Sequence, residues 1–138
     1  MTYQALDAVS AAVYTALNVP AVTALATGGV SDDPSQGTVF PFIWFEVRMS
    51  NVGGLGSGEL REVEVVVHSF TKGNGLRPTQ QLDAQAQAQL THQQLVISGY
   101  EHCASVFYDD TVSVPVSELN GEKVHEVVSS FRLVVQGA

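Results

Sequence analysis

The sequence predicts an α+β protein: a mainly antiparallel sheet of about four strands with helices packed on one face. Two observations carry this prediction. Apolar residues recur at helical spacing in residues 3–17 and again in residues 78–95. Valine-rich and aromatic runs with alternating polar and apolar positions predict strands in residues 40–49 and 60–71 and, with turns between them, in residues 104–136. The length of 138 residues suits a single domain over residues 1–138.

The first element is an amphipathic helix over residues 3–17, which Thr2 could cap. It ends at Asn18 because the residue before Pro20 is pushed out of the α region. Pro20 can open a second, short helix through about Ala26, and the glycines at 28 and 29 stop it. Four residues form the apolar stripe of the first helix: Leu6, Val9, Val13 and Leu17.

The aromatic strand at residues 40–49 holds the single Trp and three of the six Phe, and Pro41 belongs at its start. Because side chains alternate across a strand, one face is wholly apolar and should meet the core. That face carries Ile43, Phe45, Val47 and Met49. The other face mixes large aromatics with opposite charges, as is typical where a sheet meets a partner or a thin helical cover. It carries Phe42, Trp44, Glu46 and Arg48.

A glycine-rich segment, residues 50–58, predicts the mobile tip of a hairpin whose return strand runs from Leu60 to Thr71. Gly54 and Gly56 match the first two positions of the phosphate-binding pattern G-x-G-x-x-G. The third position is Glu59, and a strand follows where a pyrophosphate site needs a helix N-terminus. We therefore interpret the segment as a hairpin tip.

A third helix is predicted from Pro78 and Thr79 to about Leu95. Its buried stripe is Leu82, Ala86 and Leu90, and its remaining face is rich in Gln, with Asp83 as the only charge.

The last β region is predicted to begin with a short strand at residues 104–108 and a turn at Asp109-Asp110. Strand character continues through residues 111–116, at a sheet edge because Pro115 cannot donate a ladder hydrogen bond. Asn120-Gly121 is the strongest turn dipeptide, and it leads into a final strand over residues 123–136.

Composition excludes several classes of function. The net charge is −8 with only six Lys and Arg, which are scattered, so tight nucleic-acid binding is not expected. No run approaches the ~18 apolar residues of a membrane span. The first basic residue is Arg48, so the positively charged start of a signal peptide is lacking. Cys103 is the single cysteine, so no internal disulfide can form.

The residue patterns predict no catalytic residue, no cofactor and no metal. His102 and Cys103 are adjacent, which is not a ligand spacing, and Ser57 lies outside any G-x-S-x-G pattern. Glu62 and Glu64 share a strand face, as solvated carboxylates commonly do. Two alternatives stay open. One is a small hydrolase or isomerase using His68 or His125 with Glu64 or Glu126, and the other is a monomeric ligand-binding or toxin–antitoxin-type module.

The order of these elements resembles the tail terminator (tail completion) family of long-tailed bacteriophages and prophages. The resemblance covers nearly the whole chain. It lies in the helix at 5–17, Val-Pro-Ala-Val at 19–22, the Gly pair at 28–29, the aromatic-Pro-aromatic opening at 40–43, the strand at 64–70, the helix ending in Leu90 and Leu95, and the final strand at 125–135.

The resemblance implies a structural virion protein and not an enzyme. Such proteins form a ring, usually of six subunits, that caps the tail tube, ends its polymerisation and joins the head connector. The implied partners are other copies of the chain, the tail tube protein, and a head–tail connector or head completion protein. DNA passes through the channel without specific binding, and no membrane is involved. The implied location is the tail or neck of a virion assembled in the bacterial cytoplasm.

A ring that closes head to tail needs two different complementary patches on each subunit. The mixed strand face and the glycine-rich loop are the candidates for such contacts. The residues are Trp44, Glu46, Arg48, Gly54, Leu55, Gly56, Glu62 and Glu64. Another ring-forming neck or tail protein, either a head completion protein or a tail tube subunit, is the nearest alternative.

Overall fold

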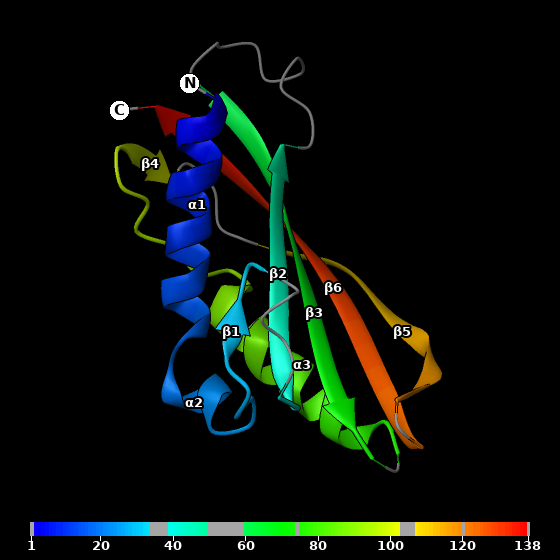
Figure 1. The fold of residues 1–138 in the computed structure, drawn as a ribbon. Helices are drawn as coiled ribbons and strands as arrows, with labels where there is room; N and C mark the ends of the chain where they lie inside the picture. Colours follow the sequence, from blue (N-terminus) through cyan, green and yellow to red (C-terminus); the bar gives the residue numbers. More distant parts are fainter. Residues whose placement is uncertain are drawn as a thin grey trace.

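A computed structural model of the chain describes residues 2–33, 39–49, 60–73, 75–102, 107–119 and 121–137. In these ranges helices cover one face of a sheet, and the sheet is strongly twisted (Figure 1). The helices are α1 (Thr2–Leu17), α2 (Pro20–Thr23) and α3 (Arg77–Leu90). The strands are β1 (Val30–Ser31), β2 (Phe42–Met49), β3 (Leu60–Lys72), β4 (Tyr100–His102), β5 (Phe107–Leu119) and β6 (Glu122–Gly137).

The α+β prediction is confirmed, and the helices lie on one face as expected. The strand order is β1-β2-β3-β6-β4, and β5 also pairs with β6. Four long strands, β2, β3, β5 and β6, match the predicted number, and four of the pairings are antiparallel. Two short strands add to them, and β1 pairs with β2 in parallel, so the sheet is mixed. Strands of two or three residues are too short to show an alternating pattern, which is why the sequence did not predict them.

The core lies between the helices and the inner face of the sheet. The predicted stripes of α1 and α3 are buried there, except that Leu6 is only partly buried, and the inner residues of β2, β3 and β6 meet them. Each fully buried aliphatic or aromatic side chain contributes roughly 1.5–3 kcal/mol, so this layer dominates the stability of the fold. Its members include Val9, Val13, Leu17, Ile43, Phe45, Val63, Val65, Val67, Leu82, Ala86, Leu90, Phe131, Leu133 and Val135.

The prediction that the glycine pair at 28 and 29 stops the second helix is wrong, because α2 already ends at Thr23. The pair instead positions β1 against β2. The Gly28 N–H donates to the Pro41 carbonyl at 2.7 Å, and the Ile43 N–H donates to the Gly29 carbonyl at 3.0 Å. A Cβ atom on Gly28 would lie 1.7 Å from the Val39 carbonyl oxygen. The absence of a side chain at Gly28 therefore lets β1 reach β2.

The predicted end of the third helix at Leu95 is wrong. Helix α3 ends at Leu90, Thr91 is extended, and His92 has a φ of 56°. Leu95 and Ile97 are nevertheless buried in the segment that follows. Their apolar character reports contact with the core, which an irregular segment can make as well as a helix.

Asp83, which the sequence pattern placed on the Gln-rich face of the third helix and outside its buried stripe, lies in the interior. Its side chain is buried, with only 3% exposed, between α3 and the sheet. The Ser129 hydroxyl of β6 donates to its carboxylate at 2.7 Å, and the Gln87 amide donates at 2.6 Å. Burial raises the pKa of Asp83 above its ordinary value, and these two hydrogen bonds oppose that rise.

The predicted turn at Asp109-Asp110 is wrong, because both residues lie within β5. The register shifts between Tyr108 and Asp110, so a β-bulge takes up the extra residue. The edge position of Pro115 is confirmed, since it falls in a second register shift, between Val114 and Ser117, on a strand that pairs only with β6 among the described residues. The predicted hairpin turn is confirmed by the Leu119–Glu122 pair and the φ of 82° at Gly121.

The predicted hairpin tip at residues 50–58 and the predicted start of a strand at Ala104 lie outside the described residues. Within the described ranges, each helix is too short or too polar to cross a membrane.

Candidate interaction surface

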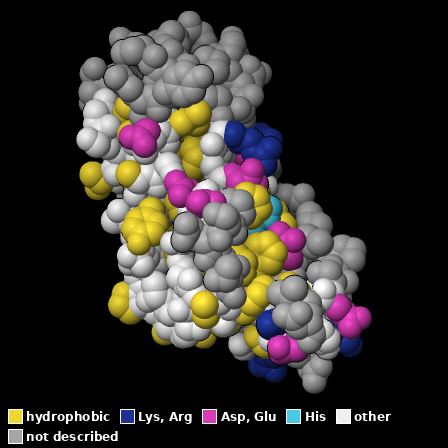
Figure 2. All heavy atoms as spheres, viewed as in Figure 1, with side chains coloured by type: hydrophobic (Ala, Val, Ile, Leu, Met, Phe, Trp, Pro, Cys, Tyr) yellow, Lys and Arg dark blue, Asp and Glu magenta, His cyan; other side chains and the backbone are white. Residues whose placement is uncertain are grey.

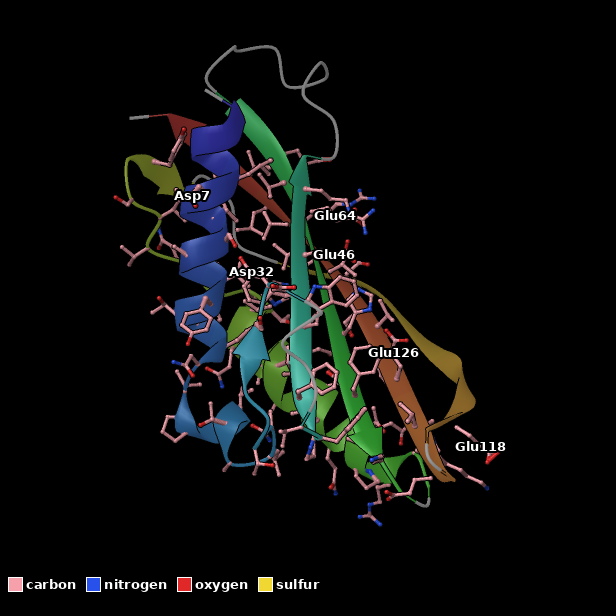
Figure 3. The ribbon with its side chains drawn as sticks, in the orientation of Figure 1. Asp7, Asp32, Glu46, Glu64, Glu118 and Glu126 are labelled. Atoms are coloured by element: carbon pink, nitrogen blue, oxygen red, sulfur yellow. The ribbon has the colours of Figure 1, made fainter. Side chains whose placement is uncertain are left out.

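The face of the sheet opposite the helices is the candidate surface, and we call it the outer face. Strand register places its residues in rows across β2, β3 and β6: Trp44 beside His68, and His68 beside Val128. Figure 3 shows Glu46, Glu64 and Glu126 on the side of the sheet away from α1. Hydrophobic and acidic side chains lie side by side on this part of the molecule (Figure 2).

At the centre of the outer face, the His68 ring lies between two carboxylates. Its Nε2 is 2.8 Å from Glu46 Oε2, and its Nδ1 is 2.6 Å from Glu126 Oε2. Both carboxylates accept, so both ring nitrogens must donate, and this is the pattern of a protonated imidazolium. Partial burial lowers the pKa of His68, but the hydrogen bonds and negative charges of Glu126 and Glu46 outweigh it, and the net pKa is raised above 6.5.

Aromatic rings extend from this cluster along the same face. Trp44 stacks on the His68 ring with centroids 4.2 Å apart, which suits a cationic imidazolium under an indole. Phe70, two residues further along β3, has its ring centroid 6.3 Å from that of His68 and stacks on Phe42 at 4.8 Å. Phe40 meets the edge of Phe42 at 5.0 Å. The rings form a continuous apolar row beside the charged cluster.

Arg48 adds a cation at the end of the outer face nearer to the N-terminus of α1. Its guanidinium is 3.4 Å from Glu64 and 3.7 Å from Glu46, and its side chain is 55% exposed. An exposed pair of this kind contributes at most about 1 kcal/mol to folding. Arg48 is therefore available to a partner at little cost to the fold.

The structure brings together five of the eight residues predicted at the interface: Trp44, Glu46, Arg48, Glu62 and Glu64 all belong to this face. The other three, Gly54, Leu55 and Gly56, lie outside the described residues. Sequence patterns did not single out Glu126 for this face, because it reaches His68 across the β3–β6 pairing, 58 residues along the chain.

The enzyme hypothesis required a histidine and a glutamate in one apolar pocket. The structure does bring His68 to Glu126, but both ring nitrogens are held by carboxylates and the ring is covered by Trp44. A general base needs a free nitrogen within reach of substrate. His125 lies on the inner side of β6, where its Nε2 meets the Gly73 carbonyl at 3.0 Å. The geometry of both histidines favours a structural role.

Comparison with known proteins identifies the family. The model of the family described as "Tail completion protein gp17" matches residues 11–136, nearly the whole chain. The chain belongs to this family of tail completion proteins. It is thus a structural protein of the phage-tail type, and its place is in the virion. The search of curated protein sequences found no match to this chain.

Two solved structures share the fold of this tail completion protein. A chain from the virion of a native gene transfer agent particle aligns with a TM-score of 0.80 and 17% identity, covering 98% of this chain and 99% of that one. The gp17 protein of bacteriophage SPP1 aligns with a TM-score of 0.56 and 16% identity, covering 94% of this chain and 89% of that one. At these identities the likeness shows a shared fold.

Proposed function

We propose that this tail completion protein assembles into a closed ring, with six subunits as the expected number, that caps the tail tube and ends its polymerisation. The free side of the ring then forms the surface to which a head–tail connector or head completion protein binds. The family match over residues 11–136 supports a role in the tail, and the outer face supplies the contact surface that a ring needs.

The outer face carries this proposal because it combines the features of an interface centre. Trp and Arg are the side chains that most often dominate binding energy, and here Trp44 and Arg48 stand among carboxylates. A ring that closes head to tail joins two different patches, so the outer face of one subunit would meet another part of its neighbour. We assign Trp44, Glu46, Arg48, Glu62 and Glu64 to this contact, together with the loop residues Gly54, Leu55 and Gly56.

The remaining expectations fit the same proposal. The net charge of −8 suits a channel wall that repels DNA phosphates, so DNA can pass through without binding. We propose that residues 1–138 act as one domain without catalytic activity. The tail tube protein lies on one side of the ring and the head-side protein on the other, after assembly in the host cytoplasm.

The first test is the mass of the protein in solution, measured by light scattering after size exclusion across a concentration series. We expect a discrete species near six chains, and electron microscopy with purified tail tubes should show a cap at one end.

Arg48→Glu should prevent the oligomer, because it places a carboxylate beside Glu46 and Glu64. Arg77→Glu is the matched control, since Arg77 is exposed at the start of α3.

A monomer at every concentration that also fails to cap tail tubes would contradict the proposal. Long self-assembled tubes would instead indicate a tail tube subunit. Equal loss of the oligomer in Arg48→Glu and Arg77→Glu would show that the outer face is not the specific contact.

A further inference from the structure

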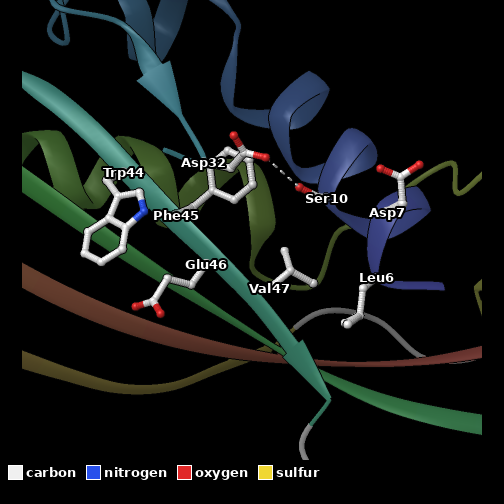
Figure 4. Close-up of a pocket in the computed structure, with 8 residues that line it drawn as sticks. All are labelled: Leu6, Asp7, Ser10, Asp32, Trp44, Phe45, Glu46 and Val47. Atoms are coloured by element: carbon white, nitrogen blue, oxygen red, sulfur yellow. Dashed lines mark hydrogen bonds between the residues drawn. The ribbon is translucent and has the colours of Figure 1, made fainter. Parts of the chain in front are cut away.

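A second surface lies on the other side of β2, in a groove between α1 and the edge of the sheet. Its volume is about 480 Å³. Leu6 of α1 and Val47 of β2 lie between the helix and the strand, and the acidic side chains of Asp7 and Asp32 flank them (Figure 4). Glu46 also borders the groove, but its carboxylate turns away toward His68.

The edge of β2 in this groove carries backbone groups without a partner among the described residues. Strand β1 covers only the start of β2, and its pairing ends at Ser31 and Trp44. The Ile43 N–H points to this edge, where it meets Gly29, and alternate residues of a strand point the same way. Both the N–H and the C=O of Val47 therefore face the groove beyond the end of β1.

An unpaired strand edge of this kind is a template for one more strand. The groove has room in the position that a longer β1 would occupy, and the edge of β2 beyond that pairing, from Glu46 to Met49, could pair with roughly four extended residues. Apolar contacts with Leu6 and Val47 would add to the main-chain hydrogen bonds. The backbone thus specifies an extended segment as the occupant.

Charge specifies the chemistry of that segment. Asp7 and Asp32 are both exposed. The Ser10 hydroxyl donates to the Asp32 carboxylate at 3.4 Å, which is longer than an ordinary hydrogen bond to a carboxylate. A basic side chain at alternate positions of an added strand would meet these two carboxylates.

A second copy of the chain is a poor occupant of the groove. Its edge strand β5 carries Asp109, Asp110 and Glu118 and has no Lys or Arg within Phe107–Leu119. Two acidic edges would repel each other at this site. A segment of a different protein satisfies both the backbone and the charge.

We propose that this groove binds an extended, lysine- or arginine-bearing segment of a partner protein, which adds a strand to β2 beside β1. The groove shares Trp44 and Glu46 with the outer face at its border. The proposal nevertheless does not depend on the ring, because strand addition uses the backbone edge of β2 and the carboxylates of Asp7 and Asp32, which the ring contact does not use. A ring that forms normally is compatible with either result of the experiment below.

The probe is a fluorescein-labelled seven-residue peptide in which lysine alternates with valine, and binding is followed by fluorescence polarisation at low salt. We expect saturable binding to the full chain. Asp7→Lys combined with Asp32→Lys should weaken it about tenfold or more, and a peptide with glutamate in place of lysine should lose it. Asp7→Lys alone, which breaks no hydrogen bond to Ser10, should weaken it by a smaller factor.

Two controls separate strand addition from simple charge attraction. Glu118→Lys changes the net charge by as much as Asp7→Lys alone, and Figure 3 places Glu118 at the opposite end of the molecule from Asp7, so binding should change by less than about twofold. Methylation of alternate backbone nitrogens of the peptide keeps its charge and removes strand hydrogen bonds, so it should weaken binding about tenfold. The Val47 amide should exchange more slowly with solvent when the peptide is present.

Three results would overturn the proposal: no binding to the unmodified chain at millimolar peptide, equal losses in Glu118→Lys and in the double variant, or full binding by the methylated peptide. Thermal unfolding of each variant checks that the fold is kept.

Discussion

His68 links three strands at the level of single side chains. Strand β3 carries it, and its ring nitrogens meet Glu46 of β2 and Glu126 of β6. Charge-assisted hydrogen bonds of this kind are about twice as strong as neutral ones, and here both nitrogens make one. The cluster therefore ties the outer face together only while the imidazole carries its proton.

The raised pKa of His68 predicts a pH-dependent stability. A group whose folded pKa lies above its unfolded value stabilises fully below the unfolded pKa, 6.5 here, and this stabilisation is lost as pH rises through the folded pKa. We expect His68→Gln to cost about 1–3 kcal/mol near pH 6 and less near pH 9. Urea unfolding, followed by the fluorescence of Trp44, which stacks on His68, measures this cost at both pH values.

The informative quantity is the difference in free energy of unfolding between His68→Gln and the unmodified protein at each pH, because contributions common to both proteins cancel. A difference that stays constant from pH 6 to pH 9 would mean that the imidazolium does not hold the three strands together.

Asp83 predicts a pH dependence in the acid range. Burial raises its pKa above 3.8 against the hydrogen bonds from Ser129 and Gln87, so protonation is favoured more in the folded protein than in the unfolded chain. The stabilising contribution is therefore fully present below about pH 3.8 and is lost as pH rises through the folded pKa. The stability advantage of the unmodified protein over Asp83→Asn should shrink by about 1.4 kcal/mol for each unit of the pKa shift.

Chemical denaturation of both proteins between pH 3 and pH 7 tests this. Parallel stability curves for the two proteins would show that the Asp83 carboxyl has its ordinary pKa in the folded state.

At the scale of elements, the glycine pair decides whether β1 can join the sheet. A Cβ at position 28 would lie 1.7 Å from the Val39 carbonyl oxygen and 2.9 Å from the Pro41 carbonyl oxygen, both backbone atoms that cannot swing aside. Gly28→Ala should destabilise the protein by about 3 kcal/mol, since the backbone must shift to accommodate the methyl group.

Gly29→Ala is the matched control for this prediction. A Cβ there meets nothing within 4 Å, so only the positive φ of 94° is unfavourable and the cost should be about 1–2 kcal/mol. The midpoints of urea unfolding measure both costs, provided that the unfolding free energy has the same dependence on urea concentration in each variant. A smaller loss for Gly28→Ala than for Gly29→Ala would mean that the close approach of β1 to β2 is not required.

The molecule as a whole presents β2 to two different environments. One face of this strand contributes Trp44, Glu46 and Arg48 to the outer face, and the edge that β1 leaves uncovered lines the groove beside α1. The two surfaces differ in chemistry: the outer face offers aromatic rings with both charges, and the groove offers backbone groups with negative charge. A subunit that must contact copies of itself and also other proteins requires such distinct surfaces.

Local patterns in the sequence were sufficient for the existence of the three helices and the four long strands, and for the direction in which most of their side chains point. The alternation in residues 42–49 separated the core residue Phe45 from Trp44 on the outer face, and the pattern of α3 placed Leu82 in the core. The hairpin at Asn120-Gly121 and the α+β class followed from equally local signals. These predictions succeeded because side-chain period and turn chemistry depend on near neighbours in the chain.

Tertiary structure alone decided the arrangement of the charged groups. The contact of His68 with Glu126 depends on the register between β3 and β6, which no local period encodes. The burial of Asp83 depends on a hydroxyl 46 residues away, and the groove beside Val47 exists because β1 stops after two residues. Such features arise from pairings between distant segments, so the sequence by itself determined the fold class and the faces of the elements, and the packing of those elements determined the two surfaces.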